Sequence, residues 1–159
     1  PIERKNISII KILREIIVDY MNQENLNVYS FYFIPTGISS STTIFGNEKL
    51  LERAFRNLIL NSIKHNPAGC NIQIEVAAKS TGIQIVISDD GIGVTIEKID
   101  FLNSSITEHI RENNKTEKPH GLGLLIVKQV IELHHGTVIF DSIEDGGFST
   151  IITLPFYEI

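Results

Sequence analysis

Residues 72–93 read IQIEVAAKSTGIQIVISDDGIG, and this stretch decides the fold. Apolar residues alternate with polar ones on both sides of Gly82, over 72–76 and again over 83–87. Strict alternation of this kind is typical of strands with one buried face, and the glycine between the runs indicates a tight connection. The sequence therefore predicts two neighbouring antiparallel strands.

The second of these strands ends in two acids followed by a glycine-rich turn. Asp89 continues the parity of the apolar residues before it, whereas Asp90 does not, so the register predicts that Asp89 points inward. Gly91 and Gly93 allow a positive φ and a close approach of the backbone to a ligand. An inward acid at a strand end can accept a hydrogen bond from an exocyclic amine. The alternative is a plain Asp-Gly hairpin turn.

Helical and strand-like periodicities extend outward from this stretch in both directions. They predict helices over 7–21, 47–67 with Asn47 as N-cap, and 122–133 ended by Gly136, with strands over 26–33, 44–45, 138–140 and 148–155. This order predicts an α/β fold of one domain over 1–159, a two-layer α/β sandwich with a mixed, largely antiparallel sheet of about five strands packed on about three helices. Residues 103–120 are polar, and a loop of that length is either functional or disordered.

Composition narrows the class of protein. The chain has 159 residues, with 42% hydrophobic and 21% charged, which excludes disordered and fibrous classes. A net charge of -5 without a basic run argues against a nucleic-acid partner. Cys70 is the single cysteine, so no intrachain disulfide forms and a reducing, intracellular setting fits. No apolar run approaches the roughly 20 residues needed to span a bilayer. Since the chain starts at Pro1 without a signal-peptide pattern, we expect a soluble piece of a larger protein.

The helix predicted over 47–67 carries a polar edge. Asn57, Asn61 and Lys64 fall within roughly 60° of one another, while the sector at Leu51 and Leu58 faces the core. A carboxamide oxygen is a hard, neutral ligand that suits a partly hydrated Mg²⁺. The ammonium of Lys64 can neutralise phosphate charge. The alternative is an ordinary solvated helix face.

Gly121-Leu-Gly-Leu124 directly precedes the apolar part of the helix over 122–133. A helix N-terminus offers unpaired N–H groups and a positive dipole end, which suit a phosphate. The alternative is that these glycines only ease a tight junction between loop and helix.

Taken together, these motifs resemble those of the catalytic, ATP-binding domain of sensor histidine kinases. That family belongs to the superfamily (GHKL) that also holds the gyrase, heat-shock chaperone and mismatch-repair ATPase domains. RNLILNSIKHNP resembles the N box, SDDGIGV the first glycine box, HGLGLLIVKQVIELHHGTV the second glycine box and GGFSTIITLP the closing strand. The resemblance covers about residues 9–156 and implies the Bergerat ATP-binding fold, with ATP and Mg²⁺ as cofactors and a flexible lid over about 95–120.

The resemblance also implies a role for each matching residue. For the metal and the phosphates it implies Asn61 as the Mg²⁺ ligand, Asn57 as a supporting amide and Lys64 as a phosphate contact, with Asn61 and Lys64 as the catalytic groups. For the base it implies Asp89 as the acid that binds the adenine amine, Gly91 and Gly93 as the turn beneath the base, His65 as the ring that flanks the nucleotide and Thr150 as a hydroxyl that supports the acid. The phosphate-binding helix start is implied at Gly121, Leu122, Gly123 and Leu124. The chain departs from the pattern at Pro119, which stands where the second box has an additional glycine. Lid aromatics are also sparse, with Phe101 the main candidate.

Asn57 bears on the reaction class. Relatives that hydrolyse ATP place a glutamate four residues before the metal-binding asparagine, as a general base for water. Here an amide stands there, and it cannot accept a proton at neutral pH. Glu52 lies about half a turn away on the helix. These features favour phosphoryl transfer to another nucleophile, which in the family is a histidine on a separate dimerisation helix.

The acceptor histidine is not expected within this chain. None of the five histidines, His65, His109, His120, His134 and His135, has the acceptor setting, and the last two fit helix-end partners better. The family implies a homodimeric protein with a cytoplasmic catalytic domain, anchored in the cell membrane, whose own dimerisation domain is phosphorylated and passes phosphate to a response regulator receiver domain. The chain alone is then expected to be inactive in histidine phosphorylation. The alternatives are an ATPase or serine kinase of the same superfamily and a degenerate nucleotide-binding scaffold.

Overall fold

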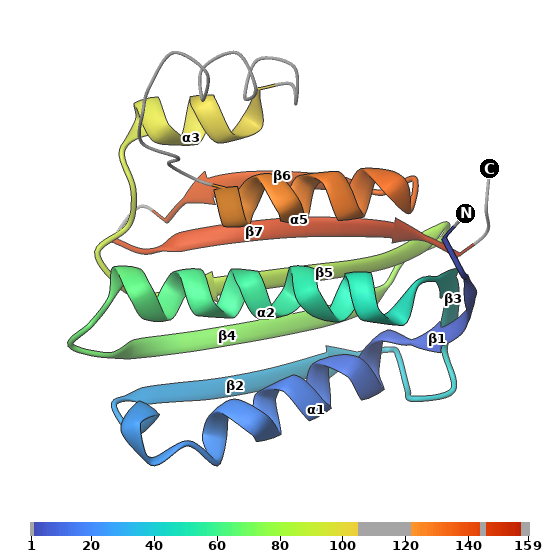
Figure 1. Cartoon of the computed structure of the whole chain (residues 1–159), viewed down its shortest axis with the longest axis horizontal. Helices are drawn as coiled ribbons and strands as arrows, with labels where there is room; N and C mark the ends of the chain where they lie inside the picture. The colour runs from blue at the N-terminus through green and yellow to red at the C-terminus, as the bar shows by residue number, and fades with distance from the viewer. Residues whose placement is uncertain (1, 105–121, 144–145, 157–159) are drawn as a thin grey trace.

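A computed structural model describes residues 2–104, 122–143 and 146–156 (Figure 1). The elements in chain order are β1 (Lys5–Ser8), α1 (Ile9–Met21), the 3₁₀ helix η1 (Glu24–Leu26), β2 (Tyr29–Thr36), β3 (Thr43–Gly46), α2 (Glu48–His65), β4 (Cys70–Ala78), β5 (Gly82–Asp89), α3 (Ile96–Asn103), α5 (Leu122–Leu133), β6 (Thr137–Ser142) and β7 (Phe148–Pro155).

The main sheet has the strand order β2-β4-β5-β7-β6. β2 runs parallel to β4, and the other neighbours are antiparallel, which confirms the mixed, largely antiparallel sheet. The two strands predicted around Gly82 pair with each other, for example Ile74 opposite Ile87. β1 and β3 form a separate two-stranded antiparallel sheet.

The second layer consists of α1, α2 and α5, which lie side by side over one face of the sheet with α2 in the middle (Figure 1). The predicted core sector of α2 is buried, with Leu51, Phe55 and Leu58 at most 2% exposed. Burying each such side chain contributes about 1.5–3 kcal/mol before entropy is counted. The two-layer α/β sandwich is thus confirmed.

Two elements in the N-terminal part of the chain begin later than expected. The helix predicted over 7–21 starts at Ile9, because Ile7 and Ser8 pair with β3 and the Ser8 hydroxyl accepts a hydrogen bond from the Lys11 N–H as the N-cap. The strand predicted over 26–33 lies three residues later, as Tyr29–Thr36. It includes Pro35, which an edge strand such as β2 tolerates.

α2 begins and ends as the sequence predicts. The side-chain oxygen of Asn47 accepts a hydrogen bond from the Leu50 N–H at 2.9 Å, as expected for an N-cap. The helix ends at His65, two residues before Pro67, and Asn66 is the C-cap. The hydroxyl of Tyr29 approaches the carbonyl oxygens of Ile63 and Asn66 at 3.0 and 2.7 Å, so it adds a side-chain contact to two carbonyls at the helix end that also accept backbone N–H groups.

α3 is the described part of the expected lid, and it is fastened to the domain. The side-chain amide of Asn103 donates to the Phe140 carbonyl at 2.8 Å and accepts from the Phe140 N–H at 2.9 Å. The Lys128 ammonium on α5 donates to the carbonyls of Leu102 and Ser104. Residues 105–120 of the lid, with Pro119, lie outside the described residues. Within the described ranges, no helix is both long enough and apolar enough to cross a membrane.

Candidate functional site

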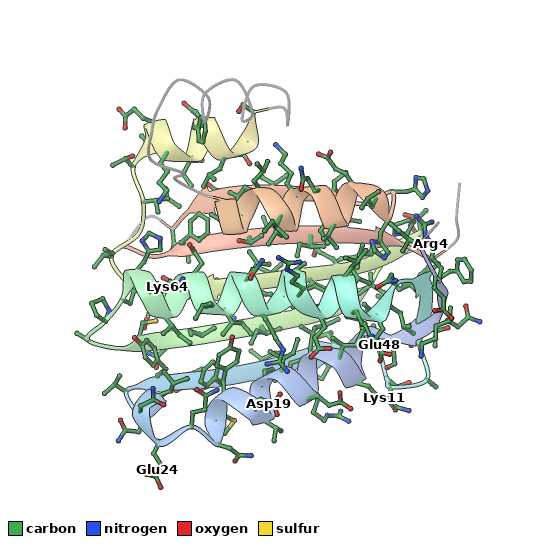
Figure 2. The ribbon with its side chains drawn as sticks, in the orientation of Figure 1. Arg4, Lys11, Asp19, Glu24, Glu48 and Lys64 are labelled. Atoms are coloured by element: carbon green, nitrogen blue, oxygen red, sulfur yellow. The ribbon has the colours of Figure 1, made fainter. Side chains whose placement is uncertain are left out.

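Three chain segments that carry the sequence motifs meet at one end of the sandwich. The C-terminal end of α2, the end of β5 and the start of α5 lie at the same end of the domain (Figure 1). Lys64 marks this end in Figure 2, whereas Arg4 and Glu48 lie at the opposite end. The tertiary structure therefore collects motifs that are separated by up to about 60 residues of chain.

Asp89 is buried at the end of β5. It is 5% exposed, and its Oδ2 accepts a hydrogen bond from the Ser62 hydroxyl at 2.7 Å. Its Oδ1 accepts from the Gly91 N–H at 3.0 Å. Asp90 is exposed instead and accepts from the N–H and side-chain amide of Asn71, both at 2.7 Å. The prediction that Asp89 points inward and Asp90 does not is thus confirmed.

The glycine turn after Asp89 packs against the end of α2. The Asn66 side chain accepts from the Ile92 N–H at 2.9 Å and donates to the Ser62 carbonyl at 2.8 Å. A Cβ on Gly91 would lie 1.9 Å from the Asn66 Oδ1, so packing requires glycine there. Gly93 has φ +74°, the left-handed conformation that favours glycine. Two hydrogen-bonded side chains, one from α2 and one from its C-cap, therefore hold both the acid and the turn.

The amide edge of α2 is open on the same side. Asn57 and Asn61 are half-buried and Lys64 is exposed. Within the described part of the chain, no hydrogen bond or ion pair engages these three side chains. A neutral amide oxygen with free acceptor capacity fits Mg²⁺, which keeps several waters and shares its remaining positions with phosphate oxygens. No cluster of three His, Cys, Asp or Glu ligands occurs among the described residues.

Glu52 faces the other way. Its carboxylate accepts from the Arg56 guanidinium at 3.0 Å, and Arg56 also pairs with Asp19 on α1 at 2.5 Å. This ion-pair cluster ties α2 to α1. Glu52, the nearest glutamate in sequence to Asn57, is thus engaged away from the amide edge.

His65 lies in the electrostatic field of the site. Burial lowers the pKa of His65, the nearby Lys98 ammonium lowers it further, and the Asp89 carboxylate opposes both. The lowered pKa favours the neutral imidazole. Cys70 is a different case, because burial and the charges of Asp89 and Asp90 raise its pKa to about 11, so it stays an unreactive thiol.

The start of α5 is only partly described. The helix begins at Leu122; Gly121 and the Leu122 side chain lie outside the described residues. Gly123 is exposed, and a Cβ there would meet nothing within 4 Å. The Leu124 side chain is 3% exposed and lies in the core, so only its backbone is available to a phosphate. The phosphate-binding role of this helix start remains a prediction.

Thr150 is buried on the inner face of β7, opposite Ile87, while Asp89 stands opposite Phe148. Its support of the acid remains a prediction. The hydroxyl that does bond Asp89 is that of Ser62, which was not predicted from the sequence; Asn66 and Lys98 were not predicted either. The signal for Ser62 was its helical spacing, since it follows the core residue Leu58 by four positions.

Known proteins resemble this chain in both sequence and structure. Residues 46–158 match the family described as histidine kinase-, DNA gyrase B-, and HSP90-like ATPase. The chain is 36% identical over 114 residues to the heme sensor protein HssS of Staphylococcus saprophyticus, covering 72% of this chain and 24% of that protein. It is 33% identical over 117 residues to the adaptive-response sensory kinase SasA of Microcystis aeruginosa, covering 72% of this chain and 30% of that protein.

Solved structures share the fold. The catalytic domain of the histidine kinase ThkA superimposes with a TM-score of 0.80 at 19% identity, covering 98% of this chain and 99% of that one. The ATP binding domain of PrrB from Mycobacterium tuberculosis gives 0.73 at 22% identity, covering 98% of both chains. The chain spans between about a quarter and a third of the length of the curated relatives it matches. The expected resemblance is confirmed: this chain belongs to the histidine kinase-, DNA gyrase B- and HSP90-like ATPase family.

Proposed function

We propose that this chain is the ATP-binding catalytic domain of a sensor histidine kinase. It binds ATP with Mg²⁺ and presents the γ-phosphoryl group to a histidine on a separate dimerisation domain. Family membership and the shared fold support this proposal. The whole protein is proposed to be a membrane-anchored homodimer whose catalytic domain is cytoplasmic and whose phosphate passes to the receiver domain of a response regulator.

The base is proposed to bind at Asp89. Among the described residues, each carboxylate oxygen has one protein donor, so acceptor capacity remains on both for the exocyclic amine of adenine. Gly91 and Gly93 form the turn below the base, and the neutral ring of His65 flanks it. A buried acid of this kind discriminates strongly against bases without the amine.

The triphosphate is proposed to lie between the amide edge of α2 and the start of α5. Asn61 coordinates Mg²⁺ with Asn57 beside it, and Lys64 contacts the phosphates. The bound Mg²⁺ would neutralise charge that develops on the transferred group. Backbone N–H groups at Gly121, Leu122, Gly123 and Leu124 are proposed to receive phosphate oxygens, with the helix dipole in support.

One observation carries the choice of transfer over hydrolysis. An amide, Asn57, stands one turn before Asn61, and the carboxylate of Glu52 is held by Arg56 on the α1 side. Water at the metal edge therefore has no carboxylate of α2 to accept its proton. Asn57 and Asn61 can orient and bind charge, but they do not act as bases.

Calorimetry with Mg²⁺ and ADP tests the base site, with Asp90→Asn as a matched control for Asp89→Asn. The carboxylate of Asp89 only accepts hydrogen bonds, whereas the amide in Asp89→Asn also donates them. The affinity for ADP should therefore fall at least about tenfold. Asp90→Asn should bind like the wild type, because Asp90 is exposed and bonds only Asn71. Equal affinities of the two variants would refute the assignment of Asp89.

Phosphorylation of the histidine-bearing dimerisation domain, added as a separate polypeptide, tests the reaction. We expect an acid-labile phosphohistidine on the added domain and little release of free phosphate by the chain alone. Rapid steady-state ATP hydrolysis by this chain would contradict the role given to Asn57. An acid-stable phosphoserine product would instead favour a serine kinase.

A further inference from the structure

Ser62 is the one polar residue on the buried face of α2. The other buried residues of the helix are Leu51, Ala54, Phe55, Leu58 and Ile59. Serine is a poorer helix former than alanine, and burying a hydroxyl is unfavourable unless it is hydrogen-bonded. The Ser62 hydroxyl, 3% exposed, makes its bond to the Asp89 Oδ2 at 2.7 Å. An alanine would serve the helix and the core better, so the hydroxyl acts on the carboxylate.

Two donors from opposite sides fix the plane of this carboxylate. Ser62 on α2 binds Oδ2, and the Gly91 N–H in the turn binds Oδ1. The terminal torsion of an aspartate is broad and has only a weak intrinsic preference. The two donors therefore decide in which direction the remaining lone pairs point, and hydrogen bonds to a carboxylate are among the stronger ones.

The Ser62 position is itself held. Its carbonyl accepts from the Asn66 side-chain amide at 2.8 Å, and the same amide group accepts from the Ile92 N–H. The hydroxyl of Tyr29 on β2 in turn donates to the Asn66 carbonyl. The helix end, the acid and the glycine turn thus form one connected hydrogen-bonded unit.

We propose that Ser62 is a positioning residue that orients the Asp89 carboxylate and thereby sets the preference of the site for a purine with an exocyclic amine at position 6. This inference rests on the proposed function, in which Asp89 receives the base. Ser62 acts through Asp89 and does not itself contact the nucleotide. Its loss should therefore reduce discrimination between bases more than it reduces binding of the sugar and phosphates.

The experiment compares ADP with IDP, whose base carries an oxygen in place of the amine, in the presence of Mg²⁺ by calorimetry. For Ser62→Ala we expect the ratio of the two dissociation constants to shrink by about tenfold. Ser62→Cys, with nearly the same volume but a weak donor, should behave like Ser62→Ala, which separates the hydrogen bond from packing. Ser88→Ala is the matched control, because Ser88 precedes Asp89 on β5 and lies half-buried on the opposite face of the sheet. The ratio of the two dissociation constants in this variant should equal that of the wild type.

The outcomes distinguish this inference from the proposed function. If the wild-type chain prefers ADP and the ratio of the dissociation constants for ADP and IDP is unchanged in both Ser62 variants, only the role of Ser62 is overturned. Equal weakening of ADP and IDP by Ser62→Ala also overturns it, since a purely structural role predicts that result. Wild-type chain that binds neither nucleotide refutes the proposed function, and wild-type chain that binds both equally refutes the base assignment together with this inference.

Discussion

Gly91→Ala should destabilise the domain at the end that holds the candidate site, although the substitution adds a single methyl group. The new Cβ would lie 1.9 Å from the Oδ1 and 2.3 Å from the Cγ of Asn66. The Asn66 carboxamide cannot rotate away without losing both of its hydrogen bonds, to the Ile92 N–H at 2.9 Å and to the Ser62 carbonyl at 2.8 Å. The backbone of the turn must shift, or the carboxamide must leave its place.

The expected loss follows from these two bonds. Each contributes about 0.5–1.5 kcal/mol net, so the free energy of unfolding should fall by about 1–3 kcal/mol. For a domain of this size a loss of about 2 kcal/mol lowers the melting temperature by about 4–8 °C. Because Asn66 and Asp89 both contact the turn, the affinity for ADP should fall as well.

Urea unfolding followed by circular dichroism measures the effect. Gly123→Ala is the control, since a Cβ at Gly123 meets nothing within 4 Å and alanine is the better helix residue; its stability should be equal to or higher than that of the wild type. In an Asn66→Ala background the clash partner is gone, and Gly91→Ala should then cost less than about 0.5 kcal/mol. The reasoning would be refuted if Gly91→Ala unfolded at the same urea concentration as the wild type. It would also be refuted if Gly91→Ala lowered the free energy of unfolding equally in the absence of the Asn66 side chain.

Two further predictions concern contacts away from the acid. Burial lowers the pKa of His134. Its Nε2 accepts a hydrogen bond from the Asn47 N–H at 2.9 Å, and its Nδ1 faces the Val130 carbonyl at 2.8 Å, so only the neutral ring fits both contacts. The unfolded chain therefore takes up the proton first, and the free energy of unfolding should fall as pH drops below the ordinary histidine value of 6.5. His134→Gln should flatten that decline in urea titrations between about pH 7.5 and about pH 5.5, and an unchanged slope would contradict the assigned bond. Asn103→Ala leaves the N–H and carbonyl of Phe140 on the edge strand β6 without their side-chain partner. Hydrogen exchange at the Phe140 amide should therefore accelerate about tenfold. Unchanged protection of that amide would show that α3 is held by other contacts.

Local patterns predicted most of the elements, but not all of them. The alternation around Gly82 predicted β4, β5 and the inward side of Asp89, because a strand places every second side chain on one face. Asn47 and Pro67 likewise marked the ends of α2. The boundary of α1 was missed because β1 exists only through its pairing with β3, about 35 residues along the chain. A partner at that distance leaves no periodic signal in the local sequence.

The amino-acid order by itself determined which residues are candidates for the proposed chemistry, an acid at a strand end and amides one helical turn apart, since these depend on period and residue type. What holds them in place was decided only by the tertiary structure. Ser62 meets Asp89, and Asn66 meets Gly91, across segments that are 27 and 25 residues apart. Hydrogen bonds and close contacts between such segments depend on how α2 packs on the sheet, which no local pattern encodes.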